Sequence, residues 1–179
     1  MKEIRIYIHT DAQIRAWTRC IMAYSIQYIK DGQMAAERTD RAAVEGHQKA
    51  ATLEGLISTL TRIADGNALP VTVICHCPGV IAAINQEQYS AWSRNGWKNS
   101  QGNEVECAAL WERVVELIGK KAPELTARPP EDSETEIMHK LGAETFDAKT
   151  PSALINRARS RIQKRKNNDW QRSQTEKNQ

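Results

Sequence analysis

One carboxylate, Asp11, closes the first apolar segment of the chain. In residues 3–11 isoleucine alternates with polar or aromatic side chains, and this period of two predicts a half-buried strand. Folds that combine strands and helices carry their chemistry at the carboxyl ends of central strands, where a carboxylate is suited to metal binding. An Asp after a strand also commonly begins a turn, so Asp11 alone leaves both interpretations open.

Two further stretches hold residues of chemical interest. Glu54 lies in the first turns of a helix predicted over residues 50–63, close to a stripe of leucine and isoleucine at helical spacing. Cys75-His76-Cys77 brings soft ligands together, but it lacks a second ligand pair at zinc-finger spacing, so we expect no zinc site from it alone. The four cysteines lack the density of a disulfide scaffold, which predicts free buried thiols.

The elements that must position these residues follow from hydrophobic spacing and turn signals. Asp31-Gly32 predicts a hairpin, so the first three strands are expected to be antiparallel. A helix before the fourth strand implies a right-handed crossover, which makes that strand parallel to the first. Ser133 and Glu136 predict a capping box at the start of a late helix. Strands are predicted at 3–11, 19–30, 33–38, 71–75 and 124–128, and helices at 50–63, from Pro78, at 105–118, at 134–146 and from Pro151, with 39–49 left unassigned.

Length and charge predict one domain with a basic extension. The chain has 179 residues, enough for one domain but too few for two ordinary ones. We expect a domain over residues 1–146 and a basic helical or disordered extension over 147–179. Residues 152–179 carry a net charge of +6 and the rest of the chain −3. This distribution is typical of a protein with a polyanionic partner, and a solubilising tail would show it as well.

The sequence predicts a cytoplasmic protein with no membrane partner. Its composition, 40% hydrophobic and 26% charged, is that of a globular protein. No apolar run approaches the ~20 residues that span a membrane. The amino terminus runs into a charged strand without the basic and apolar regions of a secretory signal.

Longer stretches of the sequence resemble type 1 ribonuclease H. The resemblance is carried by VTVICHC, GVIAAI, Trp92, Arg94, NGWKNS and Leu110–Arg113, and extends to IYIHTDA, ATLEGLIST and residues 134–141. It spans roughly residues 3–143. It implies a ribonuclease H-like α/β fold, with a mixed five-stranded sheet of three antiparallel and two parallel strands flanked by helices.

The resemblance also implies an active site of four acidic side chains around two divalent metals about 4 Å apart. Asp11 matches the Asp of the first strand and Glu54 the Glu of the first helix. The third position falls on His76, or on Cys77 with a shift of one residue, and the fourth falls on His139. Two of the four acids are therefore replaced by His in this alignment, and the loop before the last helix lacks the family's usual His.

An Asp, Glu, His, His set implies a change in the expected metal. Carboxylates suit Mg²⁺ or Mn²⁺, whereas imidazole is a poor ligand for Mg²⁺ and a good one for Mn²⁺, Fe²⁺ or Zn²⁺. We therefore expect a divalent metal, either Mg²⁺ or Mn²⁺ as in the family or a transition metal selected by the imidazoles. The same loss of negative charge also fits a former nuclease that now only binds nucleic acid.

The nucleic-acid-binding residues implied by the resemblance lie in two regions. The first matches the basic protrusion of the family, in which cations contact phosphates and aromatic rings contact sugars; Trp92 and Trp97 could instead be packing anchors. The second is the basic extension, which would add phosphate contacts without sequence preference. The residues are Trp92, Arg94, Trp97 and Lys98 in the first region and Arg157, Arg161, Lys164 and Arg165 in the second.

These observations favour one function over two others. The leading hypothesis is metal-dependent endonucleolytic hydrolysis of the RNA strand of an RNA/DNA hybrid, with hybrid or another duplex as the partner. The alternative is a catalytically inactive ribonuclease H-fold domain that binds nucleic acid. A third class is a protein-interaction module, because a fold does not fix a function.

Overall fold

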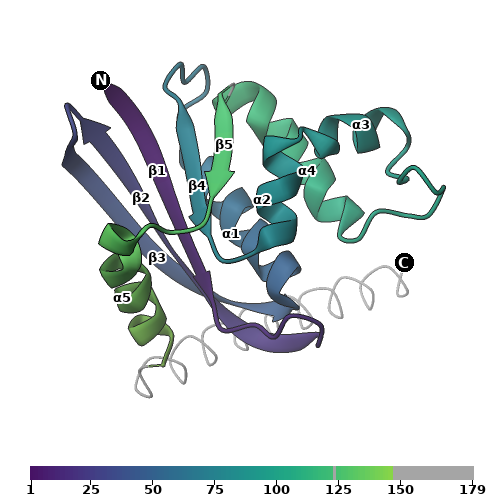
Figure 1. Cartoon of the computed structure of the whole chain (residues 1–179), viewed down its shortest axis with the longest axis horizontal. Helices are drawn as coiled ribbons and strands as arrows, with labels where there is room; N and C mark the ends of the chain where they lie inside the picture. The colour runs from purple at the N-terminus through teal and green to yellow at the C-terminus, as the bar shows by residue number, and fades with distance from the viewer. Residues whose placement is uncertain (123, 147–179) are drawn as a thin grey trace, which may run out of the picture. The chain divides into compact units, whose positions relative to one another are not determined.

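The computed structural model describes residues 1–122 and 124–146. Five strands and five helices follow one another, with a single 3-10 turn before the last helix (Figure 1). The strands are β1 (Lys2–Thr10), β2 (Thr18–Lys30), β3 (Gln33–Gly46), β4 (Val71–Cys75) and β5 (Leu125–Arg128). The helices are α1 (Gln48–Leu60), α2 (Pro78–Asn85), α3 (Gln88–Arg94), α4 (Ala108–Lys121) and α5 (Thr135–Phe146), with the turn η1 at Asp132–Glu134.

The strands form one mixed sheet in the order β3-β2-β1-β4-β5. β1 and β2 are antiparallel, as are β2 and β3, whereas β4 is parallel to β1 and β5 is parallel to β4. Both the five-strand count and the split into antiparallel and parallel pairs are as predicted. No helix within the described ranges is long and apolar enough to cross a membrane.

β3 is longer than the sequence indicated. It was expected to end near Arg38, with residues 39–49 unassigned, but it continues to Gly46 and pairs with β2 along its whole length. The prediction missed residues 39–46 because they show no regular apolar alternation: residues 39 and 40 are exposed and residues 41–44 are all partly buried. Their strand conformation is supported by backbone pairing with β2, whose own residues are largely buried.

The helices divide between the two faces of the sheet (Figure 1). α1, α2 and α4 cover one face, where residues such as Ile6, Ile8 and Met22 join the main core. α5 covers the other face with a smaller cluster of Tyr7, Ala23, Ile74, Met138 and Leu141. The alternation of Ile6 and Ile8 with Tyr7 in β1 therefore buries both sides of the strand, as the period of two requires.

α1 packs unusually close to the sheet at a glycine. A Cβ placed on Gly55 would lie 2.7 Å from Ile8 Cγ2 and 3.1 Å from Met22 Sδ. The absence of a side chain at this position therefore sets the distance between α1 and the two central strands β1 and β2.

The start of α5 differs from the predicted capping box. Ser133 and Glu136 were expected to cap it, but both are exposed, and the capping box instead joins Glu131 and Glu134 around η1. Glu134 is buried at 4% exposure, so tertiary partners decide which acidic residue serves as the cap.

The residues up to Thr145 form one compact unit, and a second unit is assigned from Phe146 onward. The character of the predicted extension over 147–179 stays a prediction, because those residues lie outside the described ranges.

Candidate functional site

The carboxyl ends of β1 and β4 bring three polar side chains together at the edge of the sheet that is formed by strand ends. The two strands are parallel, and Ile8 pairs with Cys75. The next residues are His9 and His76, so the two histidines lie at the same level at the ends of neighbouring strands, and Asp11 follows directly after the end of β1. His76 and Asp11 are exposed, and His9 is half-buried.

The pKa of His9 is set by burial and by these neighbouring groups. Burial lowers the pKa of His9, the neighbouring His76 lowers it further, and Asp11 acts in the opposite direction. These surroundings therefore favour the neutral form of His9. Asp11 also has a structural partner, because its Oδ1 accepts a hydrogen bond of 2.7 Å from the Ile21 backbone N–H.

His9 was given no role in the sequence analysis, yet it lies at the centre of this group. Its position in β1 is the signal that was missed, because alternate residues such as 7, 9 and 11 lie on the same face of an extended chain. That face is the one covered by α5, and His9 contacts α5 at Gly142. A Cβ on Gly142 would lie 3.1 Å from His9 Nε2, so the glycine allows the helix to approach the imidazole.

His139 lies on α5 and its side chain is exposed. It is three residues before Gly142, and residues three apart share one side of a helix. His139 therefore lies about 60° round α5 from the position that meets His9. The helix start expected at 134 was displaced by one residue only, so the position of His139 within the helix is as predicted.

Glu54 lies in the second turn of α1 and is half-buried. The side of α1 that faces the loop after β4 is marked by Lys49, whose Cε lies 3.0 Å from the position of a Cβ on Gly79. At about 100° per residue, Glu54 is turned about 140° round the helix from Lys49. The Lys49 side chain of α1 thus reaches the start of α2, a cation that sequence reasoning did not anticipate there.

The types of ligand group at this edge suit a transition metal. One carboxylate with imidazoles suits Mn²⁺, Fe²⁺ or Zn²⁺ better than Mg²⁺. Across the described part of the chain, however, no three His, Cys, Asp or Glu side chains are arranged to hold a metal ion. The four-residue ligand set of Asp11, Glu54, His76 and His139 therefore stays a prediction, as does Cys77 in place of His76; Cys77 is buried at 4% exposure.

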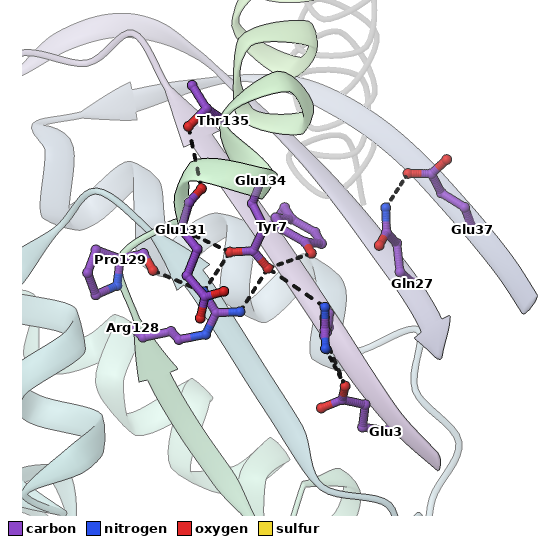
Figure 2. Close-up of polar contacts among 10 residues, drawn as sticks. Glu3, Tyr7, Gln27, Glu37, Arg128, Pro129, Glu131, Glu134 and Thr135 are labelled. Atoms are coloured by element: carbon purple, nitrogen blue, oxygen red, sulfur yellow. Dashed lines mark hydrogen bonds and ion pairs between the residues drawn. The ribbon is translucent and has the colours of Figure 1, made fainter. Parts of the chain in front are cut away.

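A buried carboxylate fixes α5 against the sheet beside this edge. Glu134 accepts a hydrogen bond of 3.0 Å from Tyr7 Oη on β1 and two, of 2.6 and 2.8 Å, from the Arg128 guanidinium at the end of β5 (Figure 2). It also accepts one from the Glu131 N–H. These donors lower the pKa of Glu134 to about 2. Burial, together with the bond to Glu134, raises the pKa of Tyr7 to about 12.

Known proteins share this arrangement of strands and helices. No family model matches the chain. A ribonuclease H of Caldicellulosiruptor saccharolyticus is 35% identical over 48 residues, which make up 27% of this chain and 33% of that protein. The matched segment thus spans about a third of the curated relative.

Solved structures match over most of the described chain. LC9-RNase H1, a type 1 RNase H with the type 2 active-site motif, has a TM-score of 0.60 at 15% identity, covering 79% of this chain and 70% of that one. The foamy viral protease-reverse transcriptase in complex with dsDNA gives 0.58 at 13% identity, covering 77% and 88%. LC11-RNase H1 in complex with RNA/DNA hybrid gives 0.52 at 15% identity, covering 78% and 93%.

The fold is ribonuclease H-like. At these identities the likeness shows the fold alone.

In this ribonuclease H-like fold, α3 and the loop to α4 carry the first predicted nucleic-acid-binding region. Trp92 and Trp97 are partly buried and pack against the core, and Trp92 meets Trp111 edge to face at 5.7 Å. Both rings therefore contribute to packing, and their part in nucleic-acid binding stays a prediction. Arg94 and Lys98 are exposed, which leaves their charges available at the surface.

The second predicted region lies outside the described residues. It comprises Arg157, Arg161, Lys164 and Arg165. Their contribution to nucleic-acid binding stays a prediction from charge alone.

Proposed function

We propose that this protein binds RNA/DNA hybrids and hydrolyses the RNA strand in a metal-dependent reaction. The proposal is supported mainly by one observation: a ribonuclease H-like fold in which Asp11 and His76 follow directly after paired, parallel strands. The carboxyl ends of such strands are where folds of this class carry their chemistry. LC11-RNase H1 is a protein of this fold in complex with RNA/DNA hybrid.

Asp11 and His76 are the proposed first ligands, with Glu54 and His139 as the remaining candidates. A divalent metal at such a site would supply an activated water for attack on a phosphodiester. The imidazoles favour Mn²⁺ or another transition metal over Mg²⁺. Burial and the neighbouring His76 lower the pKa of His9. This imidazole would therefore add little positive charge where the metal would bind.

The substrate would be held by backbone contacts rather than by base readout. Hybrid duplexes are recognised through their shape, phosphates and 2′-hydroxyls. Arg94 and Lys98 are the exposed cations of the α3–α4 region proposed for this contact, and Arg157, Arg161, Lys164 and Arg165 would extend it.

A labelled RNA/DNA hybrid tests the proposal. The full-length protein is incubated with it in Mg²⁺, Mn²⁺ or Zn²⁺, and in EDTA, with duplex DNA and duplex RNA as comparisons. We expect RNA-strand cleavage of the hybrid alone, fastest in Mn²⁺ and abolished by EDTA. Asp11→Asn and His76→Ala should each lower the rate by about 100-fold or more, while hybrid binding in a gel-shift assay is retained.

Asp65→Asn is the matched control, because Asp65 is exposed and pairs only with Lys121 at the surface in the described structure. It should leave the rate unchanged. Glu54→Gln and His139→Ala report on the two remaining candidates, and a rate within twofold of wild type removes that residue from the ligand set. Hybrid binding without cleavage in any metal would instead identify a binding domain, and neither binding nor cleavage would favour a protein-interaction module.

A further inference from the structure

β3 forms one edge of the sheet and presents a long exposed strand. Its only strand partner in the described part of the chain is β2. It is 14 residues long, and residues 33–40 are all exposed. Exposed edges of this length are templates for pairing with another strand, and proteins usually protect them with charges, bulges or short strands.

The hydrogen-bond pattern shows which backbone groups of β3 point outward. The Asp11 N–H donates to the Ile21 carbonyl, so Ile21 faces β1. Residues in an antiparallel ladder bond alternately to one side and the other. Tyr24 therefore faces β3 and its partner Asp40, and the intervening residues of β3, among them Thr39, direct their backbone groups away from β2.

Arg41 agrees with this alternation. Its backbone N–H donates to the Asp40 side chain at 2.8 Å rather than to β2. The outward N–H groups of β3 available to a partner strand thus lie at Glu37 and Thr39, since that of Arg41 is bonded to Asp40.

The sequence of this edge is self-complementary about Thr39. If a second copy pairs antiparallel with Thr39 opposite Thr39, each cation meets an anion and each small apolar residue meets another. The directly opposed pairs, each formed twice, are Arg38 with Asp40, Glu37 with Arg41 and Ala36 with Ala42. A parallel pairing in register would instead place each charge opposite a like charge, which is destabilising.

We infer that two copies of this chain associate through β3, antiparallel and centred on Thr39, to form one continuous sheet across a two-fold axis. The paired window runs from Ala36 to Ala42. At the centre two outward-facing residues oppose each other, with Cα atoms about 5.5 Å apart, and the Glu37 and Thr39 N–H groups of the two copies provide roughly four backbone hydrogen bonds. An isologous contact of this kind closes on itself and does not propagate into fibres.

Local features define the limits of the window and keep its charges in place. The β2–β3 register shifts next to Tyr28, which leaves Ala35 without a partner in β2 and bounds the window at one end. Ser25 and Gln27 hydrogen-bond to Glu37 and lower its pKa, so its carboxylate stays ionised. Asp40 already pairs with Arg62 at 2.9 Å, and its contact with the partner's Arg38 would add to that pair.

The contact is small, so the association is expected to be weak. Seven residues at about 3.4 Å each span about 24 Å of edge. A strand pair of this length buries less surface area than stable interfaces do, so we expect a dissociation constant in the micromolar range. Exposed ion pairs are screened by salt, so the dimer should weaken as NaCl is raised.

Sedimentation velocity on the full chain, from 1 to 300 µM, tests the inference. Wild type should pass from monomer to dimer across this range. Arg38→Glu places like charges opposite each other twice and should raise the dissociation constant at least tenfold. Adding Asp40→Arg in the same chain exchanges the signs and should restore the wild-type value to within about threefold. Arg15→Glu, the same change at an exposed position away from β3, should have no effect.

Cross-linking gives a second readout that does not depend on the charge-swapped variant folding. Thr39→Cys places two thiols within the Cα separation that a disulfide requires. Diamide should convert it to a covalent dimer, whereas Thr61→Cys, also exposed, should stay monomeric, as should wild type. A wild-type chain that stays monomeric throughout the concentration range would overturn the inference. An Arg38→Glu chain that associates as strongly as wild type would also overturn it, because a surface other than β3 would then form the contact.

Discussion

Glu134 shows how a single residue can be charged and buried at once. Its carboxylate receives hydrogen bonds from Tyr7, Arg128 and the Glu131 backbone, so each oxygen is satisfied. Burying an ionised carboxylate is costly unless it is paired and hydrogen-bonded. The three elements β1, β5 and α5 meet at this one group, which therefore holds α5 in the position that brings Gly142 to His9.

Glu134→Gln is expected to lower the free energy of unfolding by about 3 kcal/mol at pH 7, because it leaves the Arg128 charge without its buried partner. The folded-state pKa of Glu134, about 2, lies below its unfolded value. The stabilisation is therefore fully present above about pH 4.5 and is lost as the pH falls towards 2. Urea unfolding of both proteins at pH 7 and pH 2.5 measures the difference at each pH.

Glu131→Gln is the matched control for that prediction. Glu131 is 65% exposed and lies 3.5 Å from Arg128, so its loss should cost less than about 1 kcal/mol. Equal losses in the two variants, or a Glu134→Gln deficit that persists at pH 2.5, would contradict the role given to the buried carboxylate.

At the scale of elements, α1 is positioned by a close approach that its own helix propensity opposes. Gly in a helix interior costs about 1 kcal/mol relative to Ala. Gly55 is nevertheless required, because a Cβ there would lie 2.7 Å from Ile8 Cγ2. Ile8 is the last buried residue of β1 before the strand reaches His9, so α1 packing and the candidate site are linked through one strand.

Gly55→Ala is therefore expected to destabilise the protein by about 1–2 kcal/mol, with overpacking outweighing the gain in helix propensity. Gly119→Ala in α4 is its counterpart, because no atom lies within 4 Å of a Cβ there. That change should stabilise the protein by about 0.5–1 kcal/mol. Thermal unfolding of the two variants measures both effects, and a stabilised Gly55→Ala would show that α1 can move away from the sheet at little cost.

Elements were predicted well where burial follows a period and poorly where it does not. Ile4, Ile6 and Ile8 marked β1, and Pro78 marked the start of α2, within a residue of their positions. β3 was cut short because residues 39–46 carry no regular apolar alternation. The capping box was misplaced because Ser133 and Glu131 are both plausible caps locally, and contacts with β1 and β5 decide between them.

At the scale of the whole molecule, the proposed hybrid binding should depend steeply on salt. Phosphate contacts release counterions, so the logarithm of the binding constant falls linearly with the logarithm of salt concentration. Arg94→Ala and Lys98→Ala should each weaken hybrid binding and reduce that slope by about 1. A salt titration by fluorescence anisotropy measures the slope, with Arg15→Ala as a control at an exposed cation outside the α3–α4 region. An unchanged slope in both variants would remove this region from the interface.

The sequence by itself determined the number, order and type of nearly all elements, the sheet's mixed direction and the polar residues that follow β1 and β4. These features depend on local periodicity, turn residues and chain connectivity, all of which can be read from the sequence. Only the tertiary structure decided that His9 lies beside His76, that the Lys49 side chain of α1 reaches the start of α2, and that Glu134 is buried. Each depends on the direction of a side chain relative to a distant element, and that direction is fixed by packing between elements.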